Sequence, residues 1–171
     1  MSAIAGIYHL DGQPVDRAVL EHMTDVVSHR GPDGVGHWVD GSIGLGHLQL
    51  CTTPESLHEK QPTRSRWGDH VITWDGRIDN REDLARELAP RFSVSVDSTD
   101  VDMVLAAYAM WGTDCVKHLV GDFALALWDA TLQHLFCARD PTGMRVFHYH
   151  YDGRRFVFGT EIKQLFQYPT V

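Results

Sequence analysis

The first side chain that could do chemistry is a hydroxyl at the start of the chain, in MSAIAGIYHLDG. Ser2 precedes a segment, 3–7, whose residues are short or β-branched and uncharged, which is typical of a strand buried on both faces. Chain termini usually fray, so a start with the composition of a protein core predicts that Ser2 is held in a fixed place. A fixed hydroxyl can serve as a nucleophile when a base activates it.

The other reactive side chains are predicted to be structural. Cys51, Cys115 and Cys137 are odd in number and form no Cys-x-x-Cys pair, which indicates neither a disulfide framework nor a zinc ribbon and favours a reducing cytoplasm. His148 and His150 lack a carboxylate or cysteine at ligand spacing, so no metal site is expected. His29, Arg30 and Asp33 are interpreted as stabilising the HRGPDG turn, and the alternative for Arg30 is a position near a pocket. Two ion pairs are expected at strand ends, Arg139 with Asp140 and Glu161 with Lys163.

The composition limits the classes of function. With 171 residues, of which 43% are hydrophobic and 22% charged, the chain is expected to form a single domain, 1–171, with a continuous core. A formal net charge of -8 and the absence of a long Lys/Arg run argue against nucleic-acid binding. There is no signal-peptide pattern and no apolar run of membrane-spanning length, so neither secretion nor membrane insertion is expected.

Hydrophobic periodicity predicts helices that are separated by groups of strands. A hairpin is expected at Asp40-Gly41, a polar surface loop at 52–66, and a turn at Asp75-Gly76 that ends a strand. Four helices are expected. The first follows Asp16 and stops at Gly31-Pro32, and the second is capped near Asn80. The third runs from Ser98 or Thr99 to Gly112, and the last covers 161–166.

Four further strands are expected from Gly121 onward. The first of them, 121–129, carries apolar residues on both faces, so both faces should be covered. Strands that occur in groups, with few β-α-β alternations, indicate an α+β fold with largely antiparallel sheets. Two stacked sheets between layers of helices would cover all of these faces.

Several segments then occur in one order: IAGI (4–7), HRGPDG (29–34), GLGH (44–47), QP (61–62), DGRIDN (75–80), the helix start at Asp100, WG (111–112), GDFALALWD (121–129), ARDPTG (138–143) and TEIKQLF (160–166). In this order and spacing the chain resembles the class II glutamine amidotransferase domain that begins asparagine synthetases. The resemblance covers nearly the whole chain. It implies an N-terminal-nucleophile hydrolase fold, a four-layer αββα sandwich of two mainly antiparallel sheets.

The resemblance implies a chemical role for the start of the chain. In that family the initiator Met is removed, and a Cys at position 2 acts as nucleophile with its own α-amine as general base. Here Ser2 stands at that position, followed by Ala3 where the family usually has Gly. A small residue at position 2 favours removal of the Met, so a free amine beside the hydroxyl is expected.

Other positions that the resemblance implies depart from the family pattern. Gln49 stands where an Arg binds the α-carboxylate of glutamine, and Asp75 stands where an Asn side chain donates to the oxyanion. Gly76 retains a backbone donor, and Arg77 replaces a Glu beside the substrate's amine. Asp100 matches the residue that pairs with that amine, although an Asp at a helix start is also an ordinary cap. A neutral amide at Gln49 in place of an Arg guanidinium is expected to weaken glutamine binding. A carboxylate at Asp75 in place of a hydrogen-bond donor is expected to weaken stabilisation of the transition state.

We therefore expect a pseudo-glutaminase, which keeps the fold and no longer hydrolyses glutamine at a useful rate. The alternative is an active amidase in which Ser2 is the nucleophile and Arg77 binds the carboxylate. An engineered replacement of Cys by Ser2 would leave Gln49 and Asp75 unexplained.

The resemblance also implies a partner. In asparagine synthetases the domain supplies ammonia to a following synthetase domain, whose Ser-Gly-Gly-x-Asp-Ser pyrophosphate loop is absent from these 171 residues. ATP and Mg are therefore expected only in an associated C-terminal synthetase domain or subunit, with this chain a piece of a longer protein or a stand-alone subunit. A degenerate glutaminase half is typical of β-lactam and lasso-peptide macrolactam synthetases, and TTPESLHEKQP favours the lasso-peptide type. A homodimer is left open.

Overall fold

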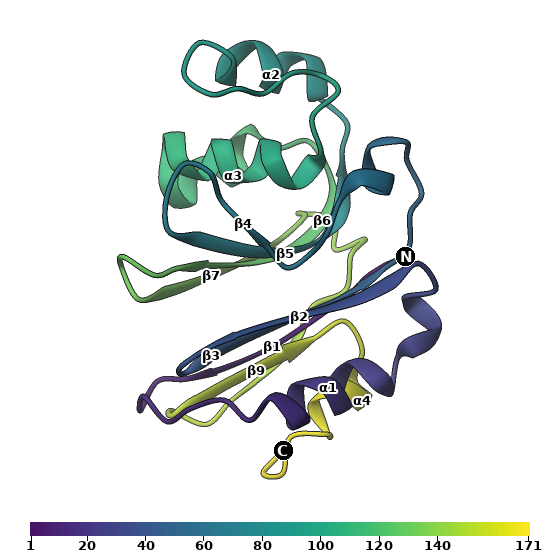
Figure 1. Ribbon diagram of the computed structural model, residues 1–171, viewed down its shortest axis with the longest axis vertical. Helices are drawn as coiled ribbons and strands as arrows, with labels where there is room; N and C mark the ends of the chain where they lie inside the picture. Colours follow the sequence, from purple (N-terminus) through teal and green to yellow (C-terminus); the bar gives the residue numbers. More distant parts are fainter.

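Two antiparallel sheets lie face to face between helices in the computed structural model, which describes residues 1–171 (Figure 1). The first sheet has the order β2 (Gly34–Asp40), β3 (Ile43–Gln49), β1 (Ala3–His9), β9 (Arg155–Gly159) and β8 (His148–Tyr151). The second has the order β4 (Thr63–Arg64), β5 (His70–Ile78), β6 (Gly121–Asp129) and β7 (His134–Arg139). This arrangement confirms the predicted α+β sandwich.

Helices form the two outer layers. The helices α1 (Arg17–Asp25) and α4 (Ile162–Leu165) pack on the first sheet, and α3 (Asp100–Trp111) packs on β5 of the second. The helix α2 (Arg81–Leu88) lies beyond α3 (Figure 1). Short 3-10 helices cover Ser28–Arg30, Glu55–His58 and Gly112–His118. The predicted caps of α1 and α3 are confirmed, because Asp16 accepts from the Ala18 N–H and Thr99 from the Asp102 N–H.

The strand β6 explains why two sheets stack. Its residues alternate between two apolar clusters: Phe123, Leu125 and Leu127 pack toward the helices, whereas Ala124, Ala126 and Trp128 pack between the sheets. Both faces are buried, as the sequence predicted. Because β6 pairs with β5 along nine residue positions, it fixes where the end of β5 lies in the molecule.

Local signals were misleading in three places. The predicted turn at Asp75-Gly76 is wrong: β5 continues to Ile78, because pairing of Asp75 with Ala124 and Gly76 with Phe123 overrides the turn preference of Asp-Gly. Asn80 precedes α2, but its side chain binds the His118 carbonyl and the Val120 N–H instead of capping the helix. The segment 52–66 is not only a surface loop, since it contains β4 and the buried Gln61.

The predicted ion pairs are confirmed in part. Glu161 lies 3.2 Å from Lys163 and is also in contact with Arg30. Asp140 does not pair with Arg139. Although burial opposes ionisation, hydrogen bonds from the Thr142 hydroxyl and from backbone N–H groups, among them that of Arg145, lower the pKa of Asp140.

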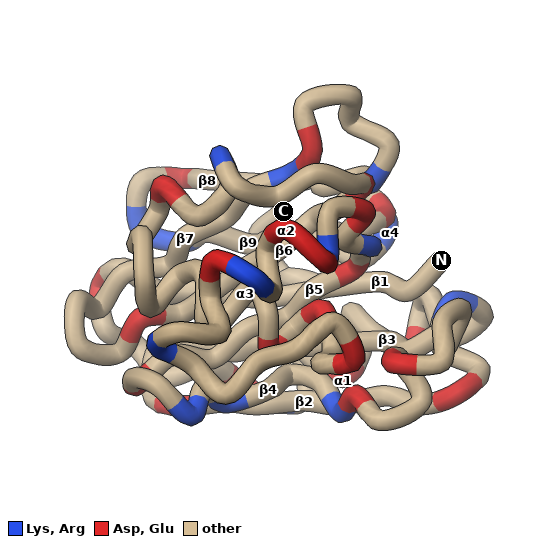
Figure 2. Tube along the Cα trace, turned by 90° about the horizontal axis from the view of Figure 1, so that it is seen from above, with Lys and Arg blue, Asp and Glu red and all other residues tan.

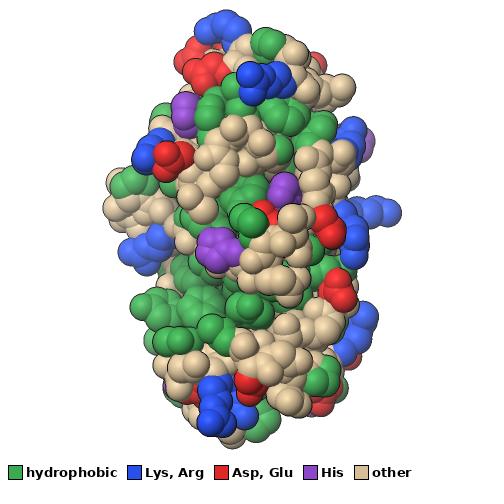
Figure 3. Space-filling model, turned by 90° about the vertical axis from the view of Figure 1, so that its left-hand side faces the viewer, with side chains coloured by type: hydrophobic (Ala, Val, Ile, Leu, Met, Phe, Trp, Pro, Cys, Tyr) green, Lys and Arg blue, Asp and Glu red, His purple; other side chains and the backbone are tan.

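The surface carries no continuous basic stripe, since Lys and Arg are scattered along the chain (Figure 2). No helix has the length and apolar character that a membrane span requires. Apolar side chains, including Tyr8, Leu135, Tyr151 and Phe156, line a groove of about 560 Å³ at the open edge between β7 and β8. Figure 3 shows this apolar face.

Candidate active site

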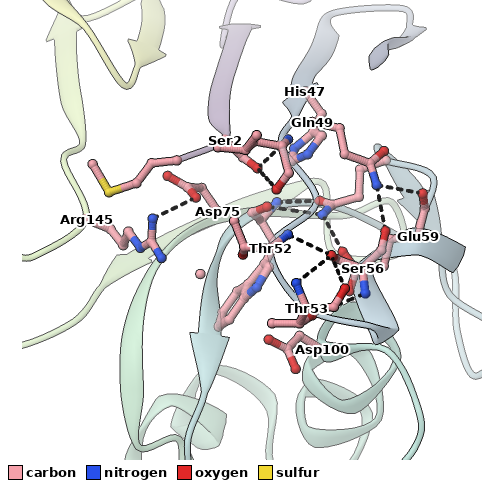
Figure 4. Close-up of a pocket in the computed structure, with 15 residues that line it drawn as sticks. Ser2, His47, Gln49, Thr52, Thr53, Ser56, Glu59, Asp75, Asp100 and Arg145 are labelled. Atoms are coloured by element: carbon pink, nitrogen blue, oxygen red, sulfur yellow. Dashed lines mark hydrogen bonds and ion pairs between the residues drawn. The ribbon is translucent and has the colours of Figure 1, made fainter. Parts of the chain in front are cut away.

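A small polar cavity lies at the end of the molecule where β1 begins and where β5 meets the start of α3 (Figure 4). Its lining contains five of the six residues that the sequence analysis singled out: Ser2, Gln49, Asp75, Gly76 and Asp100. The cavity has a volume of about 70 Å³. Ligand pockets usually enclose about 300–1,000 Å³, so this site is too small for a substrate with many atoms.

Arg77 is the predicted residue that does not line the cavity. It shares a face of β5 with Asp75, but it lies two residues farther along the strand and is exposed. There its guanidinium donates to Asp79 at 2.6 Å. Arg77 is therefore not a ligand for a molecule in the cavity, which is a correction to the sequence-based expectation.

The Ser2 hydroxyl binds backbone groups. Its Oγ accepts from the Leu50 N–H at 3.1 Å and lies 3.4 Å from the Leu50 carbonyl oxygen. No side-chain base lies within hydrogen-bond distance of this Oγ. Met1 also lines the cavity, so while Met1 is present the nitrogen of Ser2 belongs to a peptide bond. Activation of the hydroxyl by an α-amine requires the removal of Met1.

Gln49 holds the neighbouring loop. Its Nε2 donates to the Ser56 carbonyl at 2.8 Å and to the Glu59 carbonyl at 3.0 Å. Both donor hydrogens of the side chain therefore point into the loop. The wall that Gln49 forms carries no positive charge, so it offers no partner for a carboxylate.

Asp75 forms a nearly buried ion pair with a residue that sequence reasoning missed. Arg145 Nη1 lies 3.2 Å from Asp75 Oδ1, with side-chain exposures of 16% and 5% (Figure 4). Burial raises the pKa of Asp75, and the positive charge of Arg145 acts in the opposite direction. The position of Arg145 is fixed through its backbone N–H, which donates to Asp140 at 3.0 Å. The Arg145 charge is thus already neutralised within the cavity wall.

Asp100 is also occupied. One carboxylate oxygen accepts from the Ile78 N–H at 3.2 Å, and the other is in direct contact with the Arg81 guanidinium. Burial raises the pKa of Asp100, and Arg81 lowers it. Arg81 was not singled out from the sequence. With Thr99 as the actual cap of α3, Asp100 is a buried acid that joins α3 to β5 and α2.

Glu59 is a third acid in the lining, and it was missed because its segment was interpreted as surface loop. Burial, together with the nearby charge of Asp100, raises the pKa of Glu59 to about 7. Its partners are neutral donors: Gln61 Nε2 at 3.2 Å and the Val101 N–H at 3.5 Å. No group of three or more His, Cys, Asp or Glu side chains is arranged to hold a metal ion anywhere in the structure.

Comparison with known proteins identifies the family. Residues 1–171 match the glutamine amidotransferase domain. The chain belongs to this family. It is 34% identical over 157 residues to asparagine synthetase [glutamine-hydrolyzing] 3 of Bacillus subtilis, a match that covers 91% of this chain and 26% of that protein. It is 37% identical over 144 residues to the amidase chyE of Penicillium rubens, a match that covers 84% of this chain and 21% of that protein.

The fold agrees with this membership. Glutamine phosphoribosylpyrophosphate amidotransferase from B. subtilis superposes with a TM-score of 0.75 and 18% identity, over 95% of this chain and 42% of that one. The chain is thus an N-terminal class II glutamine amidotransferase domain of the asparagine synthetase family. It spans about a quarter of the length of the curated relatives that it matches.

Proposed function

We propose that this glutamine amidotransferase domain no longer hydrolyses glutamine. The observation that supports the proposal most directly is the ion pair between Asp75 and Arg145 in the wall of the cavity that contains Ser2. At the position of Asp75 the family resemblance calls for an amide that donates to the developing oxyanion. A carboxylate accepts hydrogen bonds and repels that charge, and the loss of one such donor alone costs about 3 kcal/mol of transition-state stabilisation.

The charged and amide side-chain donors in the lining do not replace the missing one. The Arg145 guanidinium is paired with Asp75. The amide of Gln49 donates into the loop, and that of Gln61 donates to the Trp74 carbonyl at 3.1 Å and to Glu59. At the position that the family resemblance indicates, the backbone N–H of Gly76 remains, and the indole N–H of Trp74 also lines the cavity without a partner.

The charge of the cavity also disfavours glutamine. The lining contains the three acids Glu59, Asp75 and Asp100, and Arg145 is its only Lys or Arg. An α-carboxylate placed among these groups would find no free positive charge, because Arg145 is paired with Asp75, and it would be repelled by the unpaired Glu59. The alternative of an active amidase with Arg77 as the carboxylate partner has no support in the structure, since Arg77 lies outside the cavity.

Without glutaminase activity, the domain would serve as the structural and docking partner of an ATP-dependent, amide-forming synthetase domain. The relatives named as asparagine synthetases are about four times as long as the region that matches this chain, which supports such a partner. ATP and Mg would then bind to that partner, and the nitrogen would come from an amine of its substrate, as in lasso-peptide macrolactam formation. With the partner present, amide formation should proceed without glutamine and should not be accelerated by it.

Glutamate release from glutamine tests the proposal. The purified chain and its Ser2→Ala variant are compared, and intact mass spectrometry establishes that Met1 has been removed from both. We expect equal rates, at the level of buffer alone. Release by the unchanged chain that Ser2→Ala abolishes would show an active amidohydrolase and would refute the proposal.

A further inference from the structure

One acid in the cavity lacks a positively charged partner. Asp75 is paired with Arg145, and Asp100 is in contact with Arg81, which approaches from outside the lining. Glu59 forms no ion pair. Its two hydrogen bonds come from a neutral amide and from a backbone N–H, which leaves a carboxylate beside Asp100 with nothing to balance its charge.

A second buried group in the same lining also lacks a partner. His47 is 1% exposed, lines the cavity, and its Nε2 makes no hydrogen bond. The Thr73 hydroxyl donates to the Gly46 carbonyl at 3.1 Å, so it can only accept from His47 Nδ1 at 3.3 Å. The proton of the imidazole is therefore on Nδ1, and Nε2 presents a lone pair. Burial lowers the pKa of His47 to about 3, which keeps the ring neutral.

A carboxylate without a cation and a lone pair without a donor call for the same kind of ligand. Such a ligand carries positive charge and several N–H groups. The cavity of about 70 Å³ has room for only a few water-sized groups. The N–H of Trp74 also lacks a partner, but it is a donor, so it does not contribute to cation binding.

We propose that the cavity binds ammonium or a short primary alkylammonium ion, whose N–H groups donate to the Glu59 carboxylate and to His47 Nε2. The inference rests on the proposed function, because a site that has lost glutamine hydrolysis is free to hold a different nitrogen compound. In this arrangement Glu59 takes over the recognition of an amine, since the charge of Asp100 is already balanced by Arg81. The domain would thereby retain a nitrogen donor that it does not release from glutamine.

Calorimetric titration of the 171-residue chain with methylammonium chloride tests the proposal. Potassium and tetramethylammonium chloride at equal ionic strength serve as comparison cations, because neither has an N–H group. We expect saturable binding of methylammonium alone. Equal binding of all three salts, or no saturable binding of methylammonium, would overturn the proposal.

Two variants locate the site. Glu59→Gln removes the charge and keeps the shape of the side chain, and we expect it to weaken methylammonium binding at least tenfold. Glu82→Gln, an exposed position on α2, makes the same chemical change away from the cavity and should bind as the unchanged chain does. Circular dichroism establishes that both variants are folded. Undiminished binding by Glu59→Gln would place the cation elsewhere and overturn the assignment.

The outcome can be separated from that of the proposed function. If glutamine is not hydrolysed and methylammonium does not bind, the ammonium site is refuted and the loss of glutaminase activity stands. If glutamate is released in a Ser2-dependent reaction, the proposed function fails whatever the titration shows.

Discussion

Asp75 and Arg145 lie 70 positions apart in the sequence and meet in the wall of the cavity. This ion pair gives Asp75 a structural role in the cavity wall. An isolated carboxylate would only repel an oxyanion, whereas a carboxylate with its own arginine is a stable part of the fold. The pair is part of the cavity wall, and the stability of the domain should depend on it.

Arg145→Ala should lower the free energy of unfolding by about 3 kcal/mol at neutral pH, because it leaves Asp75 charged and buried without a partner. Urea denaturation followed by tryptophan fluorescence measures the loss. Arg154→Ala, an exposed arginine with no ion pair, is the matched control and should change stability little. The double variant with Asp75→Asn should recover much of the loss. Equal stability of Arg145→Ala and the control would show that the pair is unimportant.

Glu59 should make stability depend on pH. Its pKa is about 7 in the folded protein and 4.5 as the ordinary value, so the folded state holds the proton more tightly than the unfolded state does. The contribution of Glu59 to stability is thus fully present below pH 4.5 and is lost as the pH rises through 7. Relative to the unchanged chain, Glu59→Gln should become more stable between these limits, by at most about 3 kcal/mol. Urea denaturation at pH 4.5 and pH 8 tests this prediction. The same difference in unfolding free energy between Glu59→Gln and the unchanged chain at both pH values would contradict it.

At the scale of elements, the site depends on the loop between β3 and β4. Gln49 ends β3 and donates to two carbonyl groups of the loop, so one side chain ties the loop to the sheet. Ser56 Oγ strengthens the loop internally by accepting from the Thr52 and Thr53 N–H groups. The Gln49 side chain therefore has a structural role.

Gln49→Ala should increase amide hydrogen exchange in residues 52–60 and lower overall stability by about 1–2 kcal/mol, because two partly buried carbonyl groups lose their donors. Gln167→Ala, which removes an exposed amide that binds only the Lys163 carbonyl, is the control. Hydrogen exchange with mass spectrometry measures the effect. Unchanged exchange in the loop would show that other contacts hold it in place.

The elements themselves were largely predictable. The two apolar faces of β6 and the caps at Asp16 and Thr99 are local signals, and each was confirmed. The continuation of β5 through Asp75-Gly76 was not predicted, because it depends on pairing at nine positions with a strand that begins at Gly121. A strong long-range pairing overrides a short turn signal, and no sequence window around Asp75 contains that information.

At the scale of the whole molecule, the family resemblance was enough to indicate five residues that line one cavity. What it did not supply was the charge partners, Arg145 and Arg81, and the third acid, Glu59. These depend on how loops from different parts of the chain pass over the ends of the sheets, and they have no spacing pattern of their own. The sequence therefore indicated which residues line the cavity, and the structure shows which groups they contact.

We propose that the groups around Ser2, and not the nucleophile alone, prevent glutamine hydrolysis. The most direct test is glutamate release by a Ser2→Cys variant, which restores the family's nucleophile and leaves Gln49 and Asp75 unchanged, measured after removal of Met1 has been verified. We expect no release above that of Ser2→Ala, and a gain only when Gln49→Arg and Asp75→Asn are added. Glutamine hydrolysis by Ser2→Cys alone would contradict it.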